Sequence, residues 1–156
     1  MPIEIDIPGL GLLRLSHLVS DYNGTLARDG ILLPGVKEAL AELSRCLAIH
    51  VVTADTFGMA SGQLEGLPIR LTILKGEGER EAKARLVSSL EGGVAVLGNG
   101  ANDLAMMDTA QLAIGVLEGE GIYAPLLTRC HIVARGALDA LGLLLNPVRI
   151  KATLRF

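Results

Sequence analysis

The stretch Asp21-Tyr22-Asn23-Gly24-Thr25 contains the side chain best suited to covalent chemistry in this sequence. Asp21 follows the apolar run Leu18-Val19-Ser20, which predicts the end of a buried strand. A carboxylate placed where a strand ends and a Gly-Thr turn begins is fixed in direction and ringed by backbone N–H groups. Such an Asp can attack phosphorus and carry an aspartyl phosphate. Taken alone, the same pattern is more often an ordinary turn.

Two segments farther along the chain carry groups that could hold a transferred phosphoryl group. Thr53, in Thr53-Ala54-Asp55, ends a predicted strand, and its hydroxyl could bond a phosphoryl oxygen. Lys83 lies on a charged predicted helix, where one ammonium group would balance the charges of nucleophile and phosphate. Each has an ordinary alternative, because Thr53 could be a strand residue or a helix cap and most such lysines are solvated.

The segment Gly98 to Asp103 is another junction between a strand and a turn. It offers the side-chain amides of Asn99 and Asn102 and the carboxylate of Asp103. Mg²⁺ prefers oxygen ligands of these kinds in octahedral geometry and keeps several waters. A loop with an Asn or Asp helix cap is the ordinary alternative. The order of the four segments, nucleophile, hydroxyl, lysine and acidic loop, favours the chemical interpretation.

Hydrophobic periodicity places these segments in an α/β fold with a mostly parallel sheet and right-handed crossovers. Alternating apolar and acidic residues over 3–7, a break at 8–11 and an apolar run over 12–20 predict an N-terminal β-hairpin that leads into a central strand. Further strands are predicted at 49–53, 69–74, 94–97, 112–116 and 131–133, and helices at 35–47, 58–64, 79–90, 102–109 and 137–145, the last ended by Pro147. Ligands bind beyond the carboxyl ends of such strands, and the four segments lie there or on the helix that follows.

Composition predicts a single domain over residues 1–156 with an aliphatic core, since half of the residues are apolar and only 3% are aromatic. The net charge of −3, without a Lys/Arg block, gives no reason to expect nucleic acid or a membrane surface. No transmembrane segment or signal peptide is predicted, and Cys46 and Cys130 do not form a spaced pair, so a cytoplasmic protein with reduced thiols is expected. The mean hydropathy of +0.46 suggests a buried sheet and leaves room for subunit contacts in a homo-oligomer.

The ordered set of motifs resembles that of the haloacid dehalogenase (HAD) superfamily, over roughly residues 16 to 145. The sequence looks closest to a soluble, stand-alone relative of the phosphorylation domain of P-type ATPases. Thr53-Ala54-Asp55 is similar to the Thr-Gly-Asp of those proteins, and Glu81-Ala82-Lys83 is similar to their lysine helix. The segment 98–103 is similar to their Gly-Asp-Gly-x-Asn-Asp loop.

The resemblance implies a Rossmann-like, three-layer fold, a bound Mg²⁺ and a covalent phosphoryl-Asp21 intermediate. The catalytic residues that it implies are Asp21, Asn23, Thr53 and Lys83. The residues that it implies for substrate binding are Gly24, Thr25, Thr53, Ala54, Lys83 and Asn102. The metal ligands that it implies are Asp21, the backbone carbonyl of Asn23, Asn99 and Asp103.

The intervals between the motifs are short. Only 27 positions (26–52) separate Thr25 from Thr53, filled by one predicted helix and its turns, and only 29 (54–82) separate Thr53 from Lys83. Neither interval can hold a large cap or a nucleotide-binding domain, and without a membrane segment ion pumping is excluded. An open site suits a phosphorylated macromolecule, or a phosphorylated small molecule enclosed by neighbouring subunits.

Two residues depart from the pattern of the superfamily. Its phosphatases carry an Asp two positions after the nucleophile, which protonates the leaving oxygen and later activates water. Asn23 can do neither, so phosphorylation of Asp21 is allowed but slow release is expected. Asn99 replaces the Asp that usually binds Mg²⁺, so weaker metal affinity is expected.

Three functions follow from these observations, of which a slow Mg²⁺-dependent phosphohydrolase comes first. The alternative is a non-catalytic or regulatory module that binds phosphate or a partner and holds a stable phospho-Asp21, or none. A scaffold without chemistry ranks last, since Asp21, Lys83 and Asp103 all stand in register. Dehalogenation needs a capped, dry pocket, which the short intervals disfavour.

Overall fold

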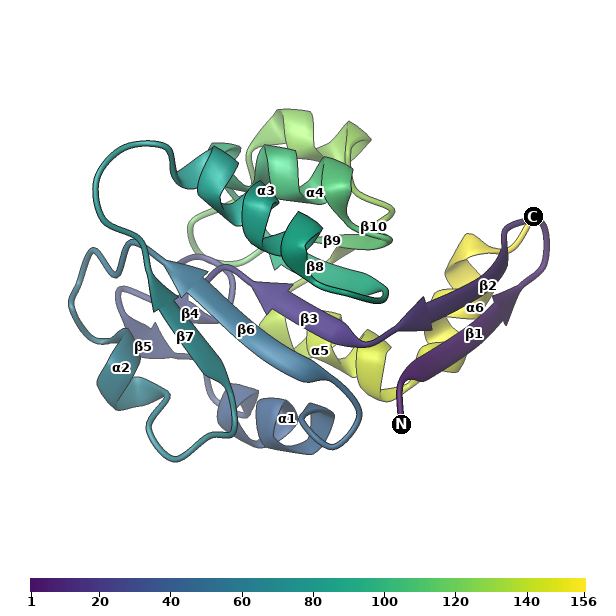
Figure 1. Ribbon diagram of the computed structural model, residues 1–156, viewed down its shortest axis with the longest axis horizontal. Coiled ribbons are helices and arrows are strands. Elements are labelled where there is room, and N and C mark those ends of the chain that lie inside the picture. Colours follow the sequence, from purple (N-terminus) through teal and green to yellow (C-terminus); the bar gives the residue numbers. More distant parts are fainter.

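A sheet of six parallel strands forms the centre of the protein, as the computed structural model of residues 1–156 shows (Figure 1). The strand order is β10-β9-β8-β3-β6-β7, with β3 in a central position. The bounds are β3 His17–Ser20, β6 Ala48–Thr53, β7 Arg70–Ile73, β8 Val94–Gly98, β9 Leu112–Val116 and β10 Ile132–Ala134. The predicted α/β fold with a mostly parallel sheet is confirmed.

Helices cover both faces of this sheet, which gives the predicted three layers (Figure 1). One face carries α1 (Val36–Leu43) and α5 (Ala137–Leu145), and the other carries α3 (Glu79–Ser89) and α4 (Leu104–Thr109). Successive strand residues point to opposite faces. Leu18 therefore belongs to the larger buried cluster with α1 and α5, and its neighbour Val19 belongs to the smaller cluster with α3 and α4.

The register of the sheet brings the motif-bearing strand ends together. Ser20, the last residue of β3, is aligned with Val51 of β6 on one side and with Leu97 of β8 on the other. The strands are parallel, so the residues that follow them leave the sheet at the same edge. Asp21 thus emerges between the ends of β6 and β8.

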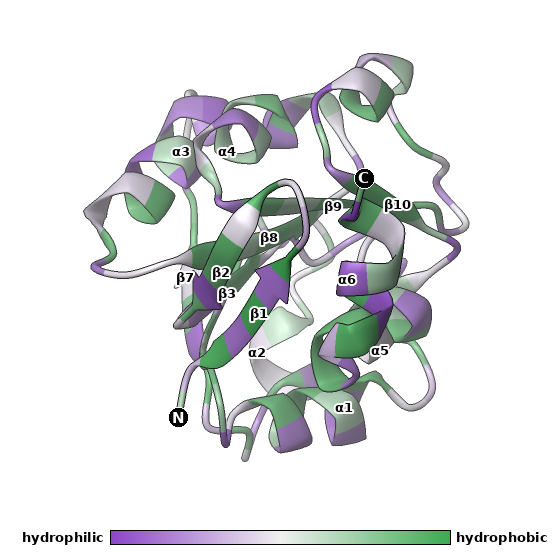
Figure 2. Ribbon diagram, turned by 90° about the vertical axis from the view of Figure 1, so that its right-hand side faces the viewer, coloured by the Kyte–Doolittle hydropathy of each residue, from purple (hydrophilic) through white to green (hydrophobic).

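The N-terminal hairpin is present and lies beside the main sheet. It consists of β1 (Ile3–Ile7) and β2 (Gly11–Leu15), and the alternating isoleucines of β1 are buried. Helix α6 (Pro147–Leu154) packs against β1, as Figure 2 shows from the side. Pro147 does follow the end of α5, but it also opens α6, which was not predicted. Proline is favoured at a first helical position because its missing N–H has no partner there.

The interval between Asp21 and α1 holds a small hairpin that was not predicted, in addition to the expected helix. Its strands are β4 (Ala27–Arg28) and β5 (Ile31–Leu32). Asp29 and Gly30 form the turn, and both have positive φ angles, of 49° and 85°. An Asp-Gly pair with this geometry is a strong hairpin signal, which the short flanking strands obscured.

No helix in the structure has the length and apolar character needed to span a membrane. The elements not yet described are short. Helix α2 spans Ala60–Gln63, and the 3₁₀ helices η1 and η2 span Ala101–Asp103 and Ala124–Thr128. The predicted helix over 102–109 therefore begins as η1 and continues as α4.

Candidate active site

Asp21 and Lys83 form an ion pair at the carboxyl edge of the sheet. The Lys83 Nζ donates to Asp21 Oδ1 at 3.0 Å and to Asp103 Oδ1 at 2.9 Å, and only 1% of the lysine surface is exposed. Burial raises the pKa of the Asp21 carboxyl to about 7, the charge of Asp103 adds to this effect, and Lys83 opposes it. Burial alone would lower the pKa of Lys83, but the two carboxylates outweigh it and raise that pKa. Lys83 is therefore charged at any physiological pH.

Asp103 holds the lysine and the loop that precedes it. Its Oδ2 accepts the backbone N–H groups of Asn99 and Gly100, both at 3.0 Å, while its Oδ1 accepts from Lys83. A Cβ on Gly98 would lie 2.6 Å from the Asp103 carboxyl carbon, so only glycine leaves room for this approach. Both oxygens of Asp103 are engaged, and the side chain is fully buried. The geometry thus shows Asp103 holding Lys83 and the loop in place, and its predicted role as a metal ligand stays a prediction.

Helix α3 is tied to the 98–103 loop by two further contacts. The Glu79 carboxylate accepts from the Asn102 side-chain amide at 2.8 Å, and Arg80 Nε donates to the Ala101 carbonyl at 3.0 Å. Glu79 lies four residues before Lys83, on the same face of the helix. These ties place the lysine against Asp21, although the two residues are 62 positions apart in the chain.

Asn99 has a fixed side-chain orientation. Its Nδ2 donates to the Gly121 carbonyl at 3.2 Å, and its Oδ1 accepts from the Thr25 hydroxyl, also at 3.2 Å. The same hydroxyl lies 3.3 Å from Asp21 Oδ2. The amide oxygen therefore faces Asp21, and the amide nitrogen faces away from it.

Asn23 uses its side chain to hold the small hairpin. Its Oδ1 accepts the Gly30 N–H at 2.9 Å, while its backbone carbonyl oxygen accepts no hydrogen bond within the chain. A free carbonyl, the Asp21 carboxylate and the Asn99 amide oxygen make an all-oxygen donor set beside one cavity. This set fits a hard cation such as Mg²⁺, with waters completing the octahedron.

The Thr53-Ala54-Asp55 turn is built around two side-chain bonds. Thr53 Oγ1 accepts the Asp55 N–H at 2.9 Å, and Asp55 Oδ1 accepts the N–H groups of Met59 and Ala60, both at 3.0 Å. Asp55 adopts a positive φ of 54°, which few residues other than Gly, Asn and Asp tolerate. The Thr53 hydroxyl keeps its own hydrogen to donate to a ligand.

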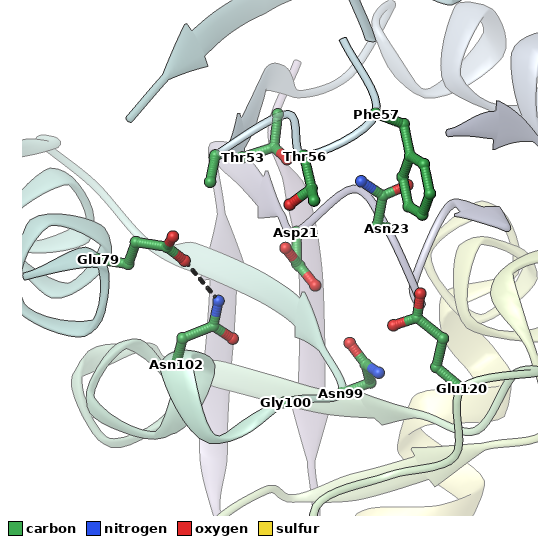
Figure 3. Close-up of a pocket in the computed structure, with 11 residues that line it drawn as sticks. Asp21, Asn23, Thr53, Thr56, Phe57, Glu79, Asn99, Gly100, Asn102 and Glu120 are labelled. Atoms are coloured by element: carbon green, nitrogen blue, oxygen red, sulfur yellow. Dashed lines mark hydrogen bonds between the residues drawn. The ribbon is translucent and has the colours of Figure 1, made fainter. Parts of the chain in front are cut away.

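A polar cavity of about 320 Å³ opens at this edge of the sheet (Figure 3). Of the predicted site residues, Asp21, Asn23, Thr53, Ala54, Asn99 and Asn102 line it. Thr25, Lys83 and Asp103 are buried beneath its floor and reach it through Asp21 and Asn99. Gly24 is not among the lining residues; it has a positive φ of 79° and lies against Asn99 and Glu120, which do line the cavity.

Five lining residues were not predicted as functional: Thr56, Phe57, Glu79, Gly100 and Glu120. Thr56 and Phe57 directly follow the Thr-Ala-Asp turn, and Glu79 precedes Lys83 by one helical turn. Glu120 follows β9 in a glycine-flanked loop, and its place after a parallel strand is the only signal that could have indicated it. Figure 3 shows its carboxylate on the same side of the cavity as Asn99.

No protein-family model matches the chain. Over 62 residues the chain is 40% identical to an uncharacterised protein of Methanocaldococcus jannaschii, an alignment that covers 40% of this chain and 67% of that protein. The chain belongs to the same family as this archaeal protein.

Several solved phosphatases share the fold. The 3-deoxy-D-manno-octulosonate 8-phosphate (KDO 8-phosphate) phosphatase of Moraxella catarrhalis, solved with magnesium, phosphate and KDO, superposes with a TM-score of 0.70 at 15% identity, covering 90% of this chain and 89% of that one. The cobalt-bound enzyme of Haemophilus influenzae has a TM-score of 0.70 at 13% identity, with 85% and 88% covered. These likenesses confirm the predicted HAD-like fold. The predicted closeness to P-type ATPases stays a prediction.

Proposed function

We propose that this chain, which has the fold of the HAD superfamily, is a Mg²⁺-dependent phosphohydrolase that acts through a phospho-Asp21 intermediate. The observation that carries the proposal is the position of Asp21. Its carboxylate lines a polar cavity, and the buried, charged Lys83 donates a hydrogen bond to it at 3.0 Å from below the cavity. A fixed nucleophile with a fixed cation next to it is the arrangement that phosphoryl transfer requires.

In the first step an Asp21 oxygen attacks phosphorus, and the bond from phosphorus to the ester oxygen breaks. The hydroxyl of Thr53 and, from the same turn, that of Thr56 donate to the phosphoryl oxygens. The leaving oxygen takes its proton from water, because the amide of Asn23 is too weak an acid to supply one. In the second step water attacks the aspartyl phosphate, and inorganic phosphate and the Asp21 carboxylate are released.

Asp21, the Asn23 carbonyl and the Asn99 amide oxygen would hold the Mg²⁺. When bound, the ion neutralises charge on the phosphoryl group and favours the ionised form of Asp21, whose pKa burial otherwise raises to about 7. Lys83 balances the remaining charge, and Asp103 keeps Lys83 in place. Asn99 brings no charge to the ion, so the affinity for Mg²⁺ is expected to be modest.

The substrate class that the cavity suits is a phosphorylated small molecule. The cavity of about 320 Å³ is at the small end of ligand pockets and fits a phosphate with a short organic part. The phosphatases of similar fold named above act on KDO 8-phosphate, a phosphorylated small molecule. Phe57, which is half exposed, would contact the organic part beyond the phosphate.

A steady-state assay tests this function. A panel of phosphate esters with Mg²⁺ should release inorganic phosphate, and both Asp21→Asn and chelation of Mg²⁺ should abolish the release. Asp21→Asn keeps the shape of the side chain and removes the nucleophile, so it is the matched control. Turnover no higher than that of Asp21→Asn for every ester would rule out the phosphohydrolase.

A regulatory module that holds a long-lived phospho-Asp21 is the second candidate, and Asn23 is the observation that favours it. Loss of a general acid and base costs about 10²- to 10⁴-fold in rate. Intact-mass measurement after treatment with acetyl phosphate separates the two functions. A phosphoryl adduct that persists for hours without multiple turnover supports the module, and an adduct that decays with turnover supports the enzyme.

A further inference from the structure

We propose that Glu120 supplies, toward the cation, the negative charge that Asn99 lacks. This inference rests on the proposed Mg²⁺-dependent function and assigns it one more residue. Glu120 lines the same cavity as Asp21, Asn23 and Asn99, and it comes from the loop after β9, outside all four motifs. Asp21 is otherwise the only carboxylate among the donor groups at this end of the cavity.

The Glu120 carboxylate and the amide nitrogen of Asn99 both approach Gly24. A Cβ placed on Gly24 would lie 2.6 Å from Asn99 Nδ2, and it would collide with Glu120 Oε2. Both side-chain ends therefore lie over Gly24, the residue that follows Asn23. Only glycine at position 24 allows this, both for space and because of its positive φ of 79°.

The loop that carries Glu120 is held in place from several sides. Glu118 to Gly121 form a tight turn, in which the Gly121 N–H donates to the Glu118 carbonyl at 2.8 Å. Asn99 binds the loop twice, through its Nδ2 to the Gly121 carbonyl and through its carbonyl to the Tyr123 N–H at 2.7 Å. The position of Glu120 is therefore coupled to that of Asn99.

Two contacts from other elements fix the far side of the turn. Glu118 Oε1 accepts the Ala137 N–H at 2.8 Å, at the start of α5. The Arg28 guanidinium from β4 lies against Gly119, where a Cβ would collide with it. A loop anchored to β4, α5 and the 98–103 segment presents Glu120 in a defined direction, as a binding residue requires.

The chemistry of Asn99 explains why the charge would come from another residue. An Asp at position 99 could not donate to the Gly121 carbonyl, and its carboxylate would lie close to that of Glu120. The amide at position 99 therefore suits a carboxylate at position 120, and a carboxylate at position 99 suits an amide at position 120. The two residues act as an exchangeable pair that places one negative charge beside the cation.

Mg²⁺ affinity, measured by isothermal titration calorimetry without substrate, tests the pair. Glu120→Gln should weaken Mg²⁺ binding by about 10-fold or more, in the range that supporting ligands typically contribute. The double variant Asn99→Asp/Glu120→Gln should recover most of the lost affinity, because it restores one carboxylate. Glu65→Gln, at an exposed position outside the cavity, is the matched control and should leave the affinity unchanged.

The outcomes separate this inference from the proposed function. An affinity unchanged in Glu120→Gln, with Mg²⁺-dependent turnover intact in the parent protein, would overturn the role of Glu120 alone. A double variant no better than Glu120→Gln would overturn the exchange with Asn99. Absence of Mg²⁺ binding by the parent protein would overturn both the role of Glu120 and the proposed function. Thermal melting of each variant checks that an affinity change does not arise from unfolding. Because Glu120 is exposed at the surface, its substitution should leave the Tm unchanged.

Discussion

Asn23 has a structural task that an Asp could also perform. Its Oδ1 accepts the Gly30 N–H at 2.9 Å, and a carboxylate oxygen at the same place accepts this bond equally well. The amide is therefore not required by the fold of the hairpin. What the amide removes is a proton donor and acceptor beside the leaving oxygen, so its effect falls on the rate of dephosphorylation.

Asn23→Asp should accordingly shorten the lifetime of phospho-Asp21 by about 10²-fold or more, the lower end of what general acid–base catalysis contributes. The lifetime is measured by intact mass after a pulse of acetyl phosphate. Asn146→Asp, which adds the same charge at an exposed position outside the cavity, is the comparison for a mere change of charge. A lifetime equal to that of the parent protein would show that position 23 does not limit release.

His50 makes the stability of the fold sensitive to acid. Its Nε2 lies 3.3 Å from His17 Nδ1, and its buried Nδ1 has no hydrogen-bond partner. Burial lowers the pKa of His50, and the neighbouring His17 and Arg70 lower it further. The folded state therefore keeps His50 neutral, while the unfolded chain takes up a proton below about pH 6.5. Because only the unfolded chain takes up this proton, the free energy of unfolding decreases as the pH falls below about 6.5.

Chemical denaturation at pH 7.5 and pH 5.5 tests this sensitivity. The free energy of unfolding should fall between the two values, and His50→Gln should reduce this fall because it removes the titrating ring. If His50→Gln loses as much stability as the parent protein does over the same pH step, the buried histidine is not the acid-sensitive group.

At the scale of elements, the attachment of α3 depends on one charge. Lys83 joins α3 to the end of β3 through Asp21 and to η1 through Asp103, and all three groups are buried. Removing one partner of a buried ion pair leaves an uncompensated charge, which typically costs 3–5 kcal/mol. Here a single lysine compensates two carboxylates, so its loss affects the helix, the strand end and the loop together.

Lys83→Met should therefore lower the free energy of unfolding at pH 7.5 by about 3 kcal/mol or more, measured by urea denaturation. Arg85→Met, on the exposed face of the same helix, should change it by less than about 0.5 kcal/mol. Mg²⁺ at saturating concentration should offset part of the loss, because it neutralises Asp21. Equal effects of the two substitutions would contradict the central role of Lys83.

The attachment of the hairpin depends on α6. Ile150 is fully buried in the larger core cluster, whereas Val148, two residues earlier, is 76% exposed. The Phe156 N–H also donates to the Pro8 carbonyl at 3.3 Å, at the hairpin turn. Helix α6 and the residues after it therefore cover the hairpin within the chain.

Ile150→Ala should cost about 2–5 kcal/mol of stability, as do comparable truncations in other cores. Val148→Ala removes methyl groups from the same helix at an exposed position and should cost less than about 0.5 kcal/mol. Hydrogen exchange of the amides of β1 and β2 would localise the effect, with faster exchange expected in Ile150→Ala only. Unchanged exchange in the hairpin would mean that α6 does not protect it.

At the scale of the whole molecule, ligand binding and stability are linked through Asp21. A ligand that binds only the folded state stabilises it by about 2.7 kcal/mol at 100 times its Kd. Mg²⁺ with beryllofluoride, a mimic of the phosphoryl group on an Asp, should therefore raise the Tm by several degrees. Asp21→Asn should remove the rise that beryllofluoride causes, and an equal rise in both proteins would place the ligand elsewhere.

The order of strands and helices could be largely predicted from the sequence because each element has its own local hydrophobic periodicity. Strand β9 has the predicted bounds, and β3, β6, β7, β8 and β10 differ from prediction by few residues. The errors fell where a local signal was ambiguous. Pro147 was interpreted only as a helix end, and Asp29-Gly30 was not recognised as a hairpin turn because its flanking strands have two residues each.

The sequence by itself determined which residues meet at the site, since three motifs follow parallel strands and the other, with Lys83, lies on the helix after β7, at the same edge of the sheet. Only the tertiary structure decided what each side chain does there. Asp103 accepts hydrogen bonds from Lys83 and two backbone N–H groups, Asn99 is oriented by the Gly121 carbonyl, and Glu120 lines the cavity from a loop outside the motifs. The physical reason is that a side chain's role depends on the partners within about 3 Å of its polar atoms. Those partners come from segments distant in the chain, which no local pattern records.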